Sequence, residues 1–189
     1  MLEDSPVTAF LHAWSEGSSQ ALGDLVALVH TDLMKMSRRA LRGAHQFPTL
    51  SPTVIVNEVY LRLAPLQGFT WENRKPFFSF AATLMRRVIV DYARAMRSDR
   101  RGRGRDRVDL DAAGLMVEQK SIEVLALEDA LVRLEKHDPF LVKLIEHKVF
   151  AGFTEDEMAE ALGVSLSKVQ REWRVAKRLL AEFLGGVRA

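Results

Sequence analysis

The chain has 189 residues, of which 48% are hydrophobic and none is cysteine, and its formal net charge is +2. This length allows one large domain or two small ones, and the absence of cysteine excludes disulfides, thiolate metal sites and thiol nucleophiles. With no apolar run near the roughly 18 residues of a membrane span and no secretory leader, we expect a cytoplasmic protein without membrane insertion.

The first part of the chain predicts two helices. Residues 7–41 carry apolar side chains at three- and four-residue spacing, with Leu22, Leu25 and Val29 on one side. Gly17–Ser19 interrupt this pattern, so we expect the two helices to be separated there.

A third and a fourth helix follow. Pro52 suits a first helical turn, and Val59 and Leu63 continue the apolar spacing behind it. Residues 67–76 contain glycine, asparagine and proline and predict a loop. Residues 77–98 are long enough for about five or six helical turns.

Residues 97–120 differ from their surroundings. Up to residue 107 they contain six arginines and two aspartates, a local net charge of +4, and glycines break any apolar periodicity. We predict a flexible basic linker; a solvated spacer that binds nothing is the alternative. The predicted fold is all-α, with helical domains at 1–96 and 121–189 joined by this linker.

The second domain begins with two further helices. Residues 121–137 predict the first, and residues 138–150 predict the second, with Asp138 as its N-cap and Pro139 at its first position.

Two short helices then predict a helix-turn-helix. Thr154 and Glu157 have the spacing of a capping box at the start of the first helix. Gly163 suits a tight turn, and Ser165 can cap the final helix.

The final helix has two contrasting faces. Val169, Trp173 and Ala176 fall on one apolar stripe, which predicts a core face. In a helix-turn-helix the second helix lies in the DNA major groove, where arginine reaches guanine edges and phosphates. A plain helical hairpin with a solvated basic face is the alternative. The opposite stripe contains Ser167, Arg171, Arg174 and Arg178.

These segments resemble a known family. GFTEDEMAEALGVSLSKVQREWRVAKRLL resembles region four of bacterial sigma factors of the sigma-70 family. SPTVIVNEVYLRL followed by FFSFAATLMRRVIVDYARA resembles region two of their extracytoplasmic-function (ECF) group, and the order, spacing and basic linker match as well. The resemblance implies an alternative sigma factor, not an enzyme, that binds core RNA polymerase, directs it to specific promoters and assists promoter opening.

The resemblance also implies which residues contact the minus-thirty-five element of promoter DNA. By position, Arg171 and Arg174 are the first choices for base or phosphate contact, and Lys177 suits a phosphate. The full implied set is Ser167, Lys168, Arg171, Arg174, Lys177 and Arg178.

The first domain is implied to recognise the minus-ten element and to capture unstacked bases. Asn73 can read a base edge, and Trp71 can stack on a base, although a core anchor is the favoured interpretation of Trp71. Asp91 is assigned to a structural pairing. The implied contacts are Trp71, Asn73, Arg74, Lys75, Arg86, Arg87 and Arg94.

The helix that begins at Pro52 resembles the segment that docks on the beta-prime clamp of the polymerase; the beta flap is a second implied contact. Most ECF sigma factors carry acids just before Asn57, where this chain reads SPTVIV. Phosphorylation of Ser51 or Thr53 by a serine/threonine kinase would restore negative charge, unless Glu58 and apolar contacts suffice. An anti-sigma factor is a further candidate partner. The implied docking residues are Asn57, Glu58, Leu61 and Arg62.

Two other classes compete. A helix-turn-helix regulator that acts without being a polymerase subunit would need the last helices but not the first domain. An enzyme has little support, because the five histidines are scattered without ligand spacing and no nucleophile stands beside a base in a known motif. We therefore expect no catalytic residue, no cofactor and no metal.

Overall fold

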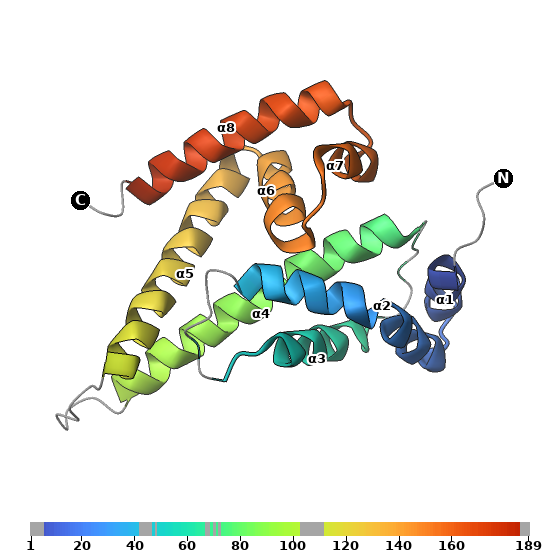
Figure 1. Cartoon of the computed structure of the whole chain (residues 1–189), viewed down its shortest axis with the longest axis horizontal. Coiled ribbons are helices and arrows are strands. Elements are labelled where there is room, and N and C mark those ends of the chain that lie inside the picture. The colour runs from blue at the N-terminus through green and yellow to red at the C-terminus, as the bar shows by residue number, and fades with distance from the viewer. Residues whose placement is uncertain are drawn as a thin grey trace.

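The computed structural model describes residues 6–41, 47, 49–66, 69, 71, 73–102 and 112–185 (Figure 1). This part of the chain contains no strand, so the predicted all-α class is confirmed. None of its helices combines the length and apolar character that a membrane crossing requires. In chain order the elements are α1 (Pro6–Ser15), α2 (Ser19–Ala40), α3 (Pro52–Leu63), α4 (Arg74–Gly102), α5 (Ala112–His137), α6 (Pro139–Ile145), the π-helix η2 (Glu146–Ala151), α7 (Glu155–Leu162) and α8 (Leu166–Gly185).

The helix starts agree with the sequence signals. Gly17 has a φ of 100° between α1 and α2, and the Ser18 hydroxyl accepts a hydrogen bond from the first turn of α2. Ser51 caps α3 in the same way, with Pro52 in the first helical turn. Asp138 caps α6. Each cap satisfies a backbone N–H that the helix leaves unpaired.

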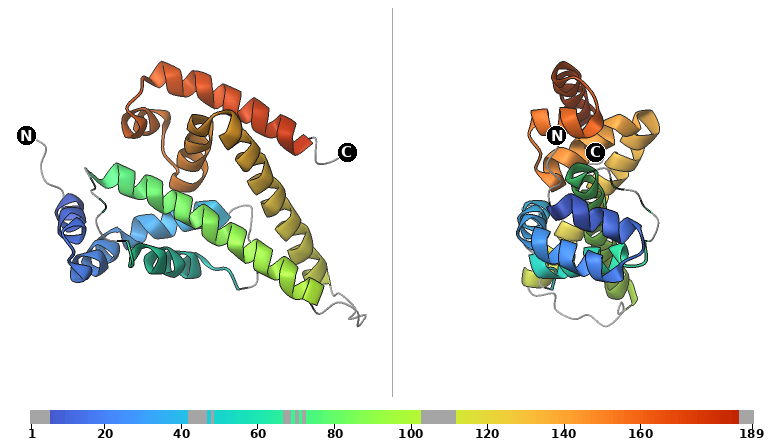
Figure 2. Two further views of the ribbon diagram at one scale, coloured as in Figure 1. Left: turned by 180° about the vertical axis from the view of Figure 1, so that it is seen from behind. Right: turned by 90° about the vertical axis from the view of Figure 1, so that its right-hand side faces the viewer.

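Helices α1 to α4 surround one apolar core. Leu11 of α1, Leu25 of α2, Ile55 of α3 and Phe77 of α4 are each fully buried and belong to one cluster. Figure 2 shows α2 and α3 lying along α4, and both helices contact it.

Helices α5 to α8 form a second core. Leu134, Leu144 and Met158 are fully buried in it, together with Val169 and Ala176 of α8. Helix α8 packs across α5, α6 and α7, so the last two helices are held against the rest of this half.

The two halves pack against each other. Helix α4 contacts both α5 and η2, and η2 also contacts α2 (Figure 1). Phe150 and Ala151 of η2 are buried in the same cluster as α1 to α4. A flexible linker would permit both an open and a closed arrangement of the halves, and the structure has the closed one.

Both ends of the segment predicted as a linker, 97–120, are helical in the structure. Helix α4 continues to Gly102, and α5 begins at Ala112, so only residues 103–111 separate the two helices; they lie outside the described residues. Arginine has a helix propensity close to that of leucine, so the arginine-rich composition that suggested a coil does not oppose a helix.

The predicted helix at 138–150 is divided in the structure. It is α-helical only to Ile145 and then continues as η2, whose C-cap Gly152 has a left-handed φ of 72°. Helices of the π type are rare and occur mainly as single turns at functional sites.

Two of the glycines with a positive φ, Gly152 and Gly163, provide a matched pair of substitutions. A Cβ at Gly163 would have nothing within 4 Å, whereas a Cβ at Gly152 would lie 2.6 Å from Cζ and 2.9 Å from Cδ of Arg39. We expect Gly163→Ala to lower the free energy of unfolding by about 1 kcal/mol through backbone strain alone. Gly152→Ala should cost more, because it also displaces the Arg39 guanidinium that donates to the Ala151 carbonyl at 3.3 Å. Urea denaturation measures both, and equal losses would contradict this account.

Candidate nucleic-acid interface

The turn between α7 and α8 has the predicted geometry. The capping box is complete, since the Thr154 hydroxyl accepts from Glu157 N at 3.2 Å and Thr154 N donates to the Glu157 carboxylate at 2.8 Å. Gly163 ends α7 with a φ of 63°, and the Ser165 hydroxyl accepts from Lys168 N at 3.3 Å. These local hydrogen bonds fix the direction in which α8 leaves the turn.

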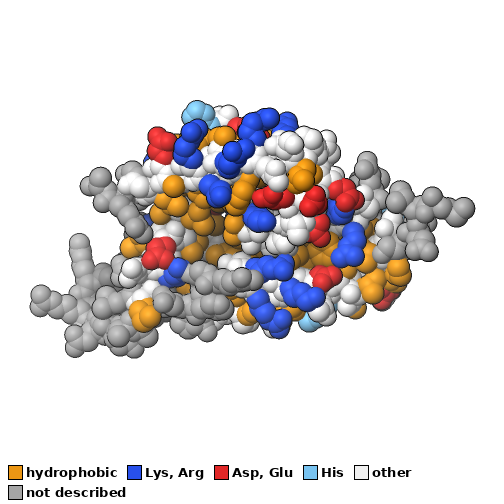
Figure 3. All heavy atoms as spheres, turned by 45° about the horizontal axis from the view of Figure 1, so that its top comes forward, with side chains coloured by type: hydrophobic (Ala, Val, Ile, Leu, Met, Phe, Trp, Pro, Cys, Tyr) orange, Lys and Arg blue, Asp and Glu red, His pale blue; other side chains and the backbone are white. Residues whose placement is uncertain are grey.

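Helix α8 presents a basic face outward. Val169 and Ala176 are fully buried, while Arg171, Arg174 and Arg178 are exposed. Figure 3 shows lysine and arginine side chains gathered over this helix. A helix held by its apolar side with arginines on the opposite side is the arrangement that enters a major groove.

Three basic side chains of α8 contact neighbours within their own half. The Lys168 ammonium lies 4.8 Å from the centroid of the Phe140 ring, and the Lys177 ammonium lies 5.8 Å from that of Trp173. Arg171 pairs with Glu172 at 2.9 Å. These interactions at a solvent-exposed surface are weak, so they leave the cations accessible to an anion.

A comparison with models of protein families shows which family this helix-turn-helix chain matches. The family model described as ECF sigma factor matches residues 4–184. The chain belongs to the ECF sigma factor family. Members of this family are sigma factors of the sigma-70 family, and their role is in transcription initiation. This role is not enzymatic; it involves RNA polymerase, promoter recognition and DNA binding. No match was found among the curated proteins.

In the first half of the sigma factor, Trp71 ahead of α4 is held by aromatic packing. Trp71 is 5% exposed, and its ring stacks on Trp14 with a centroid distance of 5.9 Å. It also meets Phe77 edge-on. Trp71 thus occupies the core-anchor position that the sequence favoured, and this arrangement does not present it to a base. Its Nε1 has no hydrogen-bond partner among the described residues.

The residues that follow Trp71 organise the start of α4. The Asn73 side chain accepts from Lys75 N at 2.9 Å and so caps the helix. Arg74 lies 3.5 Å from Asp32 of α2, and Lys75 forms an ion pair with Glu160 of α7. Lys75, one of the residues predicted to touch the minus-ten element, is therefore paired with a carboxylate of the second half.

Further along α4, Arg87 and Arg94 are exposed. Arg94 is 3.5 Å from Asp91, and Asp91 also accepts from Arg62 of α3 at 2.9 Å. The predicted structural pairing of Asp91 is confirmed. Arg87 and Arg94 remain accessible to DNA.

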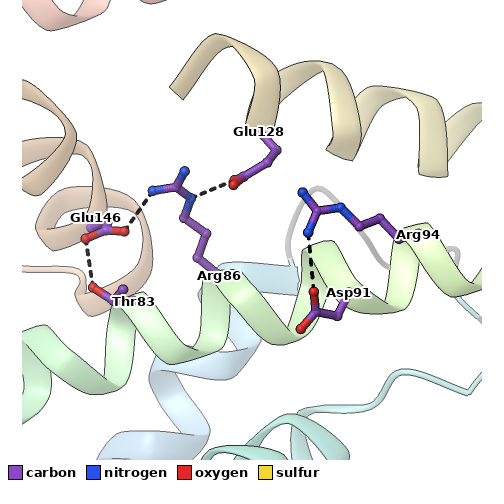
Figure 4. A network of polar contacts seen from close by, with 6 residues as sticks. All are labelled: Thr83, Arg86, Asp91, Arg94, Glu128 and Glu146. Atoms are coloured by element: carbon purple, nitrogen blue, oxygen red, sulfur yellow. Dashed lines mark hydrogen bonds and ion pairs between the residues drawn. The ribbon is translucent and has the colours of Figure 1, made fainter. Parts of the chain in front are cut away.

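The structure differs from the prediction at Arg86. Its side chain is buried, with 8% exposed, and lies between two carboxylates of the second half (Figure 4). Nε is 2.8 Å from Glu128 Oε2 of α5, and Nη1 is 2.9 Å from Glu146 Oε1 of η2. Burial lowers the pKa of Arg86, but the hydrogen bonds and charges of these carboxylates outweigh it and raise the pKa overall. In the closed arrangement Arg86 cannot reach DNA.

Neither Glu128 nor Glu146 was a predicted site residue. Glu146 is buried, and its second oxygen accepts from the Thr83 hydroxyl at 2.8 Å. A signal was present, because Arg86 has Ala82 and Val90 four residues to either side and therefore falls on an apolar face of α4. A buried arginine requires carboxylates nearby.

Docking residues on α3 vary in accessibility. Asn57 and Leu61 are exposed, Leu61 by 62%, and Glu58 is half-buried. Arg62 is engaged by Asp91, as described above. Thr53 is exposed in the first turn of α3.

His147 is a second buried polar group where the halves meet. Nδ1 lies 2.6 Å from the Lys143 carbonyl, which can only accept, so Nδ1 carries the proton and Nε2 accepts from the Ser79 hydroxyl at 2.7 Å. Burial lowers the pKa of His147, and the positive charge of Lys143 adds a smaller effect in the same direction. The hydrogen bond to the Lys143 carbonyl and the charge of Glu146 raise the pKa, but they do not outweigh the burial.

This pKa shift predicts a pH dependence of stability. The unfolded chain binds a proton at His147 near pH 6.5, above the lowered pKa of the folded state, so the stabilisation is complete above about pH 6.5 and declines below it. The slope from this group is at most about 1.4 kcal/mol per pH unit. Urea denaturation of wild type and His147→Gln between pH 8 and pH 5 should give curves that converge on acidification. Parallel curves would contradict the assignment.

Proposed function

We propose that this sigma factor binds core RNA polymerase, directs it to specific promoters and assists promoter opening. The observation that carries the proposal is the docked helix-turn-helix with Arg171, Arg174 and Arg178 exposed on α8, in a chain that the ECF sigma factor family covers almost end to end. A regulator that acts without polymerase would not need the α1 to α4 half.

The two halves divide the promoter between them. Helix α8 reads the minus-thirty-five element, with Arg171 and Arg174 on bases or adjacent phosphates and Ser167, Lys168, Lys177 and Arg178 at its flanks. The start of α4 holds the minus-ten element through Asn73, Arg74 and Lys75. Arg86, Arg87 and Arg94 contact the duplex just upstream of it, and Arg86 does so once α5 and η2 have moved away from α4. The exposure of Arg74, Arg87 and Arg94 on α4 and of the three arginines of α8 supports this assignment.

Helix α3 docks on the beta-prime clamp, and the second half contacts the beta flap. The support for the first contact is the exposure of three apolar side chains of α3, Val54, Tyr60 and Leu61, on the helix that also carries Asn57 and Glu58. Exposed apolar side chains gathered on one helix mark interaction sites more often than chance exposure does.

Run-off transcription tests the proposal. Core polymerase reconstituted with the chain is used to select genomic DNA fragments, and the selected fragments serve as templates. We expect defined start sites only when the chain is present. Selection of fragments without transcription would instead support a regulator that acts apart from polymerase.

Substitutions on α8 test the reading surface. Arg171→Ala and Arg174→Ala should each weaken binding of the holoenzyme to a selected promoter by about fivefold to a hundredfold, since one such contact contributes about 1–3 kcal/mol. Arg133→Ala on α5 is the matched control, because it removes an exposed arginine from another surface. Fluorescence anisotropy with labelled promoter DNA measures the affinities. Equal losses in all three variants would remove α8 from the interface.

Phosphorylation of α3 is the proposed regulation of polymerase docking. The first turn of α3 contains no acid, and a phosphate there is favoured by the helix dipole. Thr53 is the better target, because the Ser51 hydroxyl already caps the helix by accepting from Val54 N at 3.3 Å.

Thr53→Glu should bind core polymerase about threefold more tightly than Thr53→Ala, the scale of one added surface charge. Kinase-treated wild type should exceed both variants. Thr31→Glu, an exposed position on α2, controls for the added charge. Equal affinities of all forms, with and without kinase, would reject this regulation.

A further inference from the structure

Carboxylates of the second half cover cations that the proposed function assigns to DNA. Glu128 and Glu146 hold the Arg86 guanidinium at 2.8 Å and 2.9 Å, and Glu160 pairs with Lys75. These acids come from three different elements, α5, η2 and α7. We call Glu128, Glu146 and Glu160 the acidic cover.

The acidic cover meets α4 at two separate places. Lys75 lies in the first turn of α4, and Arg86 lies eleven residues further on, about three turns along the helix. A single chance ion pair would not account for both places. The second half therefore follows α4 along the length that the proposed function assigns to promoter DNA.

Apolar packing holds the cover in place. Phe150 and Ala151 are 6% and 5% exposed within the cluster of α1 to α4, and Val124, Leu125 and Phe153 pack against that cluster. Hydrophobic burial supplies a non-directional attraction, and the carboxylates fix the orientation in which the halves meet. Arg39 adds a hydrogen bond to the Ala151 carbonyl.

The cover and a phosphate cannot occupy Arg86 together. A guanidinium binds carboxylate and phosphate oxygens through the same N–H groups and with the same planar geometry. Arg86 already donates Nε and Nη1 to two carboxylates in a buried site. Binding of DNA at Arg86 thus requires that α5 and η2 leave α4.

We infer that the acidic cover substitutes for DNA phosphates within the chain and holds the free sigma factor closed. The closed form keeps Arg86 and Lys75 from DNA, and docking on core polymerase separates the halves and releases them. The inference rests on the proposed function for the role of these two cations. In the free chain, the part of the DNA affinity that depends on Arg86 and Lys75 is available only in the open fraction of molecules.

Distances between the halves test the closed form directly. The native chain contains no cysteine, so spin labels can be placed at Ala27→Cys on α2 and Glu182→Cys on α8, both exposed positions, without removing other thiols. Double electron–electron resonance should give one narrow distance distribution for the free chain. Core polymerase should shift it to longer distances.

Glu128→Gln/Glu146→Gln should broaden the distribution and lengthen its mean without polymerase. Asp129→Asn/Glu135→Gln is the matched control, because it removes two exposed carboxylates from α5 with the same change in net charge. Glu160→Gln changes a side chain that is 71% exposed and so poses no threat to folding, and it should produce a smaller change in the same direction. A broad distribution in wild type, or closed distributions in both cover variants, overturns the inference.

DNA binding by the free chain gives a second, independent readout. Binding of a labelled random-sequence duplex is measured against salt concentration. Release of Arg86 and Lys75 should steepen the slope of log K against log salt by up to about 1.8, or 0.9 for each additional phosphate that the chain neutralises. The matched control should keep the wild-type slope. An opened chain with an unchanged slope overturns the inference.

Run-off transcription by the wild-type chain is measured in addition to the distances and the DNA binding. Its absence would reject the proposed function, whereas the distances and salt slopes decide the acidic cover separately.

Discussion

A buried guanidinium dictates much of this structure. Arg86 lies on a largely apolar face of α4, and a buried charge there is stable only when groups of opposite charge pair with it. Among the described residues, the acids that meet it come from the second half, Glu128 from α5 and Glu146 from η2. The first half therefore depends on the second to satisfy its own core, and this dependence joins two cores that the sequence would allow to fold separately.

The same cations serve two partners in succession. Lys75 and Arg86 meet carboxylates when the halves are together, and the proposed function gives them phosphates when the halves are apart. Arg171, Arg174 and Arg178 stay exposed on α8 in the closed arrangement. The two promoter-reading surfaces are thus unequal: the one on α8 is open in the free chain, and the one on α4 is covered at Lys75 and Arg86. A sigma factor of this design gains full DNA affinity only after its halves have separated.

Local signals in the sequence predicted local structure well. The caps at Thr154 and Asp138, the turn at Gly163 and the buried stripe of α8 depend on interactions within a few residues and agree with the structure. Features set by distant parts of the chain were less accessible. Helix α4 extends beyond the predicted boundary, η2 departs from the helical period, and Arg86 turns inward because its partners lie 42 and 60 residues away.

The π-helix η2 sets the angular position of these side chains. A π turn contains more residues than an α turn, and removing one residue would rotate everything beyond it by about 100°. Glu146 and His147 at its beginning and Phe150 and Ala151 at its end all face the first half. Deletion of this additional residue would turn one of these two groups into solvent. The phase of a single helical turn thus decides whether the halves associate.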